Sequence, residues 1–117
     1  MAKRKQRRRE RKRAATVDYS DAEGNVLTLR ESLSPGTIAK IGEPPAAAAT
    51  SLDDAWRRRE ELLFERLAVR WEIAGLPLDD QAMLIGRYRM ADEETRRWVR
   101  EAIATHLRRH IPELAGS

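Results

Sequence analysis

The residues best suited to chemistry in this sequence are the basic side chains at its N-terminus. The first thirteen positions hold nine Lys or Arg residues and one acid, Glu10, so this segment carries a formal charge of +8. A guanidinium group grips a phosphate through two parallel hydrogen bonds, and its plane stacks on exposed bases. The pattern therefore predicts a polyanion-binding segment, with nucleic acid as the favoured ligand. The candidate binding residues are Lys3, Arg4, Lys5, Arg7, Arg8, Arg9, Arg11, Lys12 and Arg13.

The rest of the chain has the opposite charge. Residues 14–117 contain fourteen basic and eighteen acidic residues, a balance of −4, so the high isoelectric point of about 10.0 comes from the N-terminal segment alone. A block of like charges repels itself and has no apolar surface to bury, so residues 1–15 are expected to form a disordered tail. An alternative interpretation is that this tail docks on an acidic protein.

The stretch from Gln6 to Ala15 (Gln-Arg-Arg-Arg-Glu-Arg-Lys-Arg-Ala-Ala) resembles the arginine-rich RNA-binding peptides of phage antitermination proteins and of a retroviral RNA-export protein. Such peptides fold as helices on structured RNA. The resemblance concerns residues 3–15 only. It implies that Arg7, Arg8, Arg9 and Arg11 contact phosphates and a groove, and it favours RNA over DNA.

Other chemistries have weaker support in the sequence. Cysteine is absent, which excludes disulfides, thiolate nucleophiles and Cys-based zinc sites. His106 and His110 stand four apart on a predicted helix, a spacing that permits joint metal coordination, but the chain has no third histidine. The acidic pair Glu60-Glu61 lies in a charged helical turn, and there is no glycine-rich phosphate loop, nucleophile elbow or triad motif. We therefore expect no metal, no cofactor and no enzymatic activity.

A second nucleic-acid interpretation places the binding site in the C-terminal helices. Predicted helices over 80–90 and 93–110 could form a helix-turn-helix, with Arg96, Arg97 and Arg100 facing a groove. Glu93 and Glu94 dilute the charge of that face, so this alternative is less favoured than the tail.

Short elements come first along the chain. Apolar and polar residues alternate on both sides of a turn-forming stretch, which predicts a β-hairpin over residues 16–30. Ser34-Pro35 has the form of an N-cap followed by proline at the first helical position, and it predicts a short helix over 35–41. Residues 42–50 contain two prolines and four alanines and are interpreted as a linker.

A long helix is predicted over Leu52–Ala74, where neither glycine nor proline occurs. Its apolar stripe is Trp56, Leu63, Leu67, Trp71 and Ala74, separated by seven, four, four and three positions. Gly75 is interpreted as the residue just beyond this helix, with Leu76 as the hydrophobic contact that closes its end.

Two further helices are predicted at the C-terminal end. Asp79 would cap a helix over 80–90, with Leu78 and Met83 as a hydrophobic staple, and Asp92 would cap a helix over 93–110. The apolar face of the last helix comprises Val99, Ala102, Ile103, His106, Leu107 and His110.

Together these patterns predict a mainly α protein. Its expected organisation is a disordered basic tail (1–15), a β-hairpin with a short helix (16–41), a Pro/Ala linker (42–50) and a three-helix module (51–113). The function that follows is that of a small, non-enzymatic accessory protein in the cytoplasm that binds nucleic acid through its tail. The helical body would serve for protein contact or homodimerisation. The alternative is a structural, protein-interaction module. Arg outnumbers Lys nineteen to four, a bias that suits a bacterial source.

Overall fold

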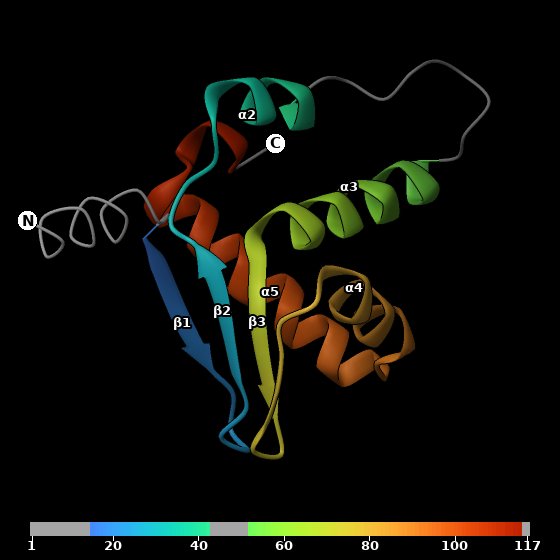
Figure 1. Ribbon diagram of the computed structural model, residues 1–117. Helices are drawn as coiled ribbons and strands as arrows, with labels where there is room; N and C mark the ends of the chain where they lie inside the picture. Colours follow the sequence, from blue (N-terminus) through green and yellow to red (C-terminus); the bar gives the residue numbers. More distant parts are fainter. Residues whose placement is uncertain (1–14, 43–51, 116–117) are drawn as a thin grey trace, which may run out of the picture.

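The computed structural model describes residues 15–42 and 52–115. The strands are β1 (Thr16–Ser20), β2 (Val26–Arg30), β3 (Ala68–Ile73) and β4 (Leu76–Leu78). The helices are α2 (Pro35–Gly42), α3 (Leu52–Leu67), α4 (Gln81–Met90) and α5 (Glu93–His110), followed by a 3₁₀ turn, η1 (Pro112–Leu114). The four strands form one antiparallel sheet in chain order, and α5 runs along one face of it (Figure 1). The chain is therefore an α+β protein, and the prediction of a mainly α fold is wrong.

The predicted N-terminal hairpin is confirmed as β1 and β2. Its turn is organised by Asp21, whose Oδ1 accepts hydrogen bonds from the backbone N–H groups of Glu23 and Asn25, each at 2.9 Å. Gly24 supplies the positive φ, at 85°. The short helix predicted over 35–41 is also present, because Ser34 Oγ accepts from the Thr37 N–H at 3.2 Å and caps α2.

The helix predicted over Leu52–Ala74 is wrong in its last third. α3 ends at Leu67, and the next six residues form β3. Trp71 is buried as the helical stripe required, but it is buried from a strand, opposite Leu27 of β2. Val69, Trp71 and Ile73 are β-branched or aromatic and favour a pleated, half-buried surface. Pairing with β2 gives these residues a partner that no local helical pattern reveals.

A β-bulge explains how two residues of β3 that are spaced as on a helix can face the same side of the sheet. Ala68 and Trp71 are three apart, so an uninterrupted strand would place them on opposite faces. The register shifts between Thr28 and Leu29, so that Leu29 pairs with Ala68 and Thr28 with Arg70, leaving Val69 as the extra residue. Both Ala68 and Trp71 consequently face the core.

The turn after β3 was predicted as the end of a helix and is instead a hairpin. Ala74 and Gly75 both have positive φ, 53° and 79°, as a tight two-residue turn of this hand requires. Leu76 does not close a helix end, because 72% of it is exposed. Pro77 lies on the edge strand β4, where its missing N–H is tolerated.

The two C-terminal helices agree with the predicted spans, apart from one cap. Asp92 caps α5 as expected, with its Oδ1 2.7 Å from the Thr95 backbone nitrogen. Asp80 rather than Asp79 caps α4, accepting from the Met83 N–H at 3.0 Å. The predicted Leu78–Met83 staple is wrong, since Met83 is 58% exposed.

One core joins the hairpin to the helices. Leu27 and Leu29 of β2 are fully buried in the same cluster as residues from α3, β3, α4 and α5. At its centre the Phe64 ring stacks on Tyr88, with ring centroids 4.8 Å apart, and meets Trp71 edge-on at 5.8 Å. On α5 the buried residues are Val99, Ala102, Ile103, His106 and Leu107. The predicted tail and linker lie outside the described residues, except at Ala15 and Gly42, and so does the side chain of Trp56.

Candidate functional site

The nine basic residues that the sequence singled out, Lys3 to Arg13, lie outside the described residues. The first residue that the structure describes after that segment is Ala15. The Ala15 carbonyl accepts a hydrogen bond from the Glu31 N–H at 2.7 Å, which extends the β1–β2 pairing by one bond. Arg13 is therefore only three residues from Thr16, the first residue of an edge strand of the sheet.

His106 lies beside this point and ties α5 to both strands of the hairpin. It is completely buried, with Nε2 2.7 Å from the Arg30 carbonyl and Nδ1 2.8 Å from the Tyr19 hydroxyl. A carbonyl only accepts, so Nε2 carries the proton, and the neutral ring accepts from Tyr19 through Nδ1. The ring also packs on His110, with centroids 4.8 Å apart, and His110 Nδ1 lies 3.9 Å from a Glu31 carboxylate oxygen. The contacts of both histidines thus join the C-terminal half of α5 to the β1–β2 hairpin and to Glu31, the residue that follows it.

We expect this histidine to make folding stability depend on pH. Burial lowers the pKa of His106 below its ordinary value of 6.5, and the nearby charge of His110 lowers it further, whereas hydrogen bonding of the ring to the backbone of Arg30 and Glu31 raises it in part. Well above pH 6.5 His106 is neutral in both the folded and the unfolded chain, so its full contribution to the free energy of unfolding is present. As the pH falls from 6.5 towards the lower folded-state pKa, the unfolded chain binds more protons and stability is lost. Urea unfolding at pH 7.5, 6.5 and 5.5 should show this decline.

The matched controls for that decline are His106→Gln and His110→Gln. The first variant should be less stable at every pH and should lose most of the slope between pH 7.5 and 5.5. The second should keep most of the slope, because burial, the largest cause of the lowered pKa of His106, remains. An unchanged slope in His106→Gln would show that other groups cause the decline.

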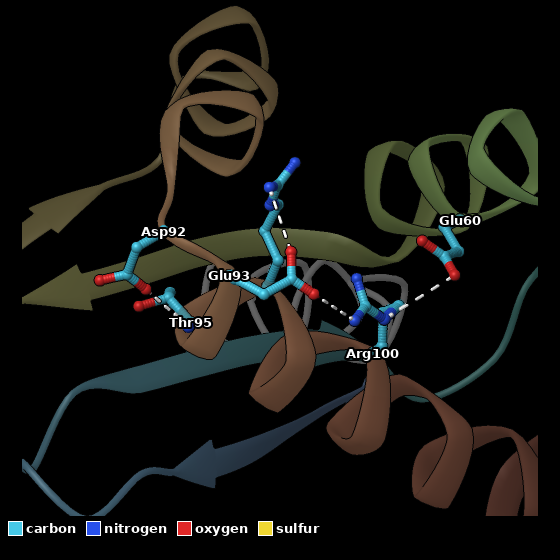
Figure 2. Close-up of polar contacts among 6 residues, drawn as sticks. Glu60, Asp92, Glu93, Thr95 and Arg100 are labelled. Atoms are coloured by element: carbon cyan, nitrogen blue, oxygen red, sulfur yellow. Dashed lines mark hydrogen bonds and ion pairs between the residues drawn. The ribbon is translucent and has the colours of Figure 1, made fainter.

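A second polar region is a charged cleft of about 620 Å³ between α3, α4 and the N-terminal half of α5. Four arginines, three glutamates and one tyrosine line it, namely Arg57, Glu60, Glu61, Tyr88, Arg89, Glu93, Arg96 and Arg100. Figure 2 shows Arg100 reaching between Glu60 of α3 and Glu93 of α5. The corresponding N–O distances are 3.8 Å and 3.3 Å. Arg96 pairs with Glu93 at 3.3 Å, and Arg89 pairs with Glu61 at 2.9 Å.

Partial burial and the neighbouring charges shift the pKa values of two side chains that line the cleft, Glu60 and Tyr88. Burial raises the pKa of Glu60, and the positive charges of Arg100 and Arg57 offset part of that rise. Burial also raises the pKa of Tyr88, to which the charge of Glu60 adds. At the start of α5, the hydrogen bonds from Thr95 lower the pKa of Asp92, which suits its role as a helix cap.

Three of the cleft arginines, Arg89, Arg96 and Arg100, pair with carboxylates of the same chain, so an external anion would have to displace those carboxylates. Arg96 and Arg100, which the helix-turn-helix alternative would direct at a groove, are among those engaged in this way. We therefore assign the cleft a structural role in joining α5 to α3. Sequence reasoning did not find this cluster, because its members come from three helices whose packing is tertiary.

The described residues contain no group of three or more His, Cys, Asp or Glu side chains suited to holding a metal ion. No helix within residues 15–42 and 52–115 combines the length and the apolar character needed to cross a membrane. No protein-family model matches this chain, and neither does any curated protein or solved structure.

Proposed function

We propose that this chain is a small, non-enzymatic nucleic-acid-binding protein of the cytoplasm, with RNA favoured over DNA. The observation that carries the proposal is the separation of charge: +8 within residues 1–13 against −4 in all the rest. The basic segment supplies affinity for phosphates, and the α+β body supplies a folded surface for contact with a protein or a second copy. Three of the four cleft arginines already pair with glutamates of the same chain, so the cleft is a weaker candidate for anion binding than the basic segment.

The direct test is a titration of the full chain with a labelled single-stranded RNA across a range of salt. Each neutralised phosphate releases counterions, so engagement of about six to eight tail charges predicts a slope of log K against log salt of roughly −4 to −6. The same titration with DNA of matching sequence measures the preference for RNA. Nucleic acid that co-purifies with the chain and is removed by nuclease would agree with the proposal. Affinity that does not change with salt would refute it.

The alternative is a protein-interaction module whose basic segment docks on an acidic partner. Its support in the structure is on α4, where Met83 and Met90 are 58% and 85% exposed. They are seven residues apart and so lie on one side of the helix, and exposed methionines suit adaptable protein contacts. A chain that purifies free of nucleic acid and binds polyglutamate as tightly as RNA would favour this alternative.

A further inference from the structure

The sheet has two edges, and the edge at β4 is poorly suited to pairing with another strand. β4 has only three residues, and Ile73 and Leu76 form a hydrogen-bonded pair across the two-residue turn that precedes it. Pairs alternate along an antiparallel ladder, so Pro77, opposite Glu72, directs its backbone away from β3. Proline has no N–H, so this edge lacks the donor at its centre.

β1 lies at the other edge, and its register with β2 shows which of its backbone groups point outward (Figure 1). The Asp21 N–H donates to the Asn25 carbonyl at 3.0 Å, so these two residues form a hydrogen-bonded pair. At the other end of the ladder, the Ala15 carbonyl accepts from the Glu31 N–H at 2.7 Å. Hydrogen-bonded pairs recur at every second position between them. The residues that direct their N–H and C=O groups away from β2 are therefore Thr16, Asp18 and Ser20.

These outward backbone groups have no partner in the described part of the chain. Within residues 15–42 and 52–115 no hydrogen bond reaches the three N–H and three C=O groups, and all three residues are exposed. β1 has no proline, lysine or bulge, which are features by which edge strands avoid pairing with other chains. β1 is therefore an open template for a further strand.

The side chains of β1 define what such a strand should carry. Tyr19 contacts α5 through His106, so alternation places Asp18, the only charged residue of β1, on the opposite face of the sheet. One carboxylate oxygen of Asp18 accepts from the Thr28 hydroxyl at 2.7 Å, and the other has no partner among the described residues. A cationic side chain directly opposite would pair with Asp18 and stabilise the added strand. Its neighbours would lie beside the half-buried Val17 and Tyr19 and should be apolar.

A second copy of β1 fits this edge poorly. Antiparallel pairing that uses all six outward groups would set Asp18 against Asp18 of the second copy, and like charges directly opposite destabilise a sheet. We propose instead that β1 binds an extended segment of another protein as a fifth, antiparallel strand, with a lysine or arginine opposite Asp18 between two apolar residues. The inference goes beyond the proposed function and does not depend on nucleic-acid binding.

The probes are two synthetic peptides, Thr-Val-Arg-Val-Thr and Thr-Val-Glu-Val-Thr, titrated into the isotope-labelled full chain without nucleic acid. The backbone amide resonances of Thr16, Asp18 and Ser20 should shift the most, because their N–H groups gain acceptors. Arginine in place of glutamate turns a like-charge pair with Asp18 into an opposite-charge pair, so the arginine peptide should bind β1 about fivefold more tightly. No shift at these amides would overturn the inference and leave the proposed function standing.

Charge exchange supplies the matched control. In Asp18→Lys the preference should reverse in favour of the glutamate peptide. Asp79→Lys makes the same change of charge at an exposed residue just after β4, at the opposite edge, and it should keep the parent preference. The same preference in both variants would overturn the pairing with Asp18.

Methylation of the peptide backbone tests the strand pairing itself. An N-methyl group on the arginine removes an N–H that faces β1, so binding should be lost. The same group on the second valine lies on an amide that faces solvent, so binding should persist. Protection of the β1 amides that grows with protein concentration in the absence of peptide would make a second copy the occupant and overturn the inference.

Discussion

Deletion of residues 1–13 should lower the affinity of the chain for RNA by roughly three orders of magnitude at low salt, because nine cationic side chains are lost. The remaining chain carries a net charge of −4, so its long-range field repels phosphate. The fourteen basic residues that remain are outnumbered by eighteen acidic ones, so any residual binding should be weak and sensitive to salt. Fluorescence anisotropy with a labelled RNA measures the change directly.

The deletion is informative only if the body stays folded. It leaves the Ala15–Glu31 hydrogen bond and every residue of the core in place, so the circular dichroism spectrum and the melting temperature should not change. A truncated chain that binds RNA as tightly as the parent would refute the proposal and direct attention to the body.

A charge-preserving variant separates shaped recognition from plain attraction. Changing Arg7, Arg8, Arg9 and Arg11 to lysine keeps the charge and removes the planar fork. The resemblance to arginine-rich RNA-binding peptides predicts a loss of affinity for structured RNA. An unchanged affinity would show that the segment acts as a simple polycation.

The sequence predicted those elements whose information is local. The hairpin over 16–30 is encoded by alternation and by the Asp21-to-Asn25 turn, and α5 by the Asp92 cap and an apolar face. β3 was missed because its bulge gives Ala68 and Trp71 a spacing of three, which continues the helical stripe of α3. Only pairing with β2, some forty residues earlier in the chain, selects the strand.

The same division applies to the candidate sites. The basic segment is visible in the sequence because its residues are contiguous. The Tyr19–His106 hydrogen bond joins residues 87 positions apart, and the Glu60–Arg100 pair joins α3 to α5, so neither leaves a local signal.

Trp71→Ala should be the most destabilising single change in the body. The indole is 1% exposed, faces Leu27 across the sheet, meets Phe64 edge-on at 5.8 Å and lies under the Arg87 guanidinium, 5.8 Å from the ring centroid. Truncating a buried tryptophan costs about 3–5 kcal/mol, which corresponds to a fall in melting temperature of at least about 10 °C for a domain of this size. Thermal melts followed by far-UV circular dichroism measure the change.

Two further variants assign this loss to packing. Trp71→Phe keeps an aromatic ring against Phe64 and removes an indole N–H that is buried without a hydrogen-bond partner among the described residues, so it should cost clearly less than alanine. Met90→Ala, at a residue that is 85% exposed, should change the free energy of unfolding by less than about 0.5 kcal/mol. If Trp71→Ala melted at the temperature of Met90→Ala, Trp71 could not occupy the centre of the core, and the pairing of β2 with β3 would be wrong.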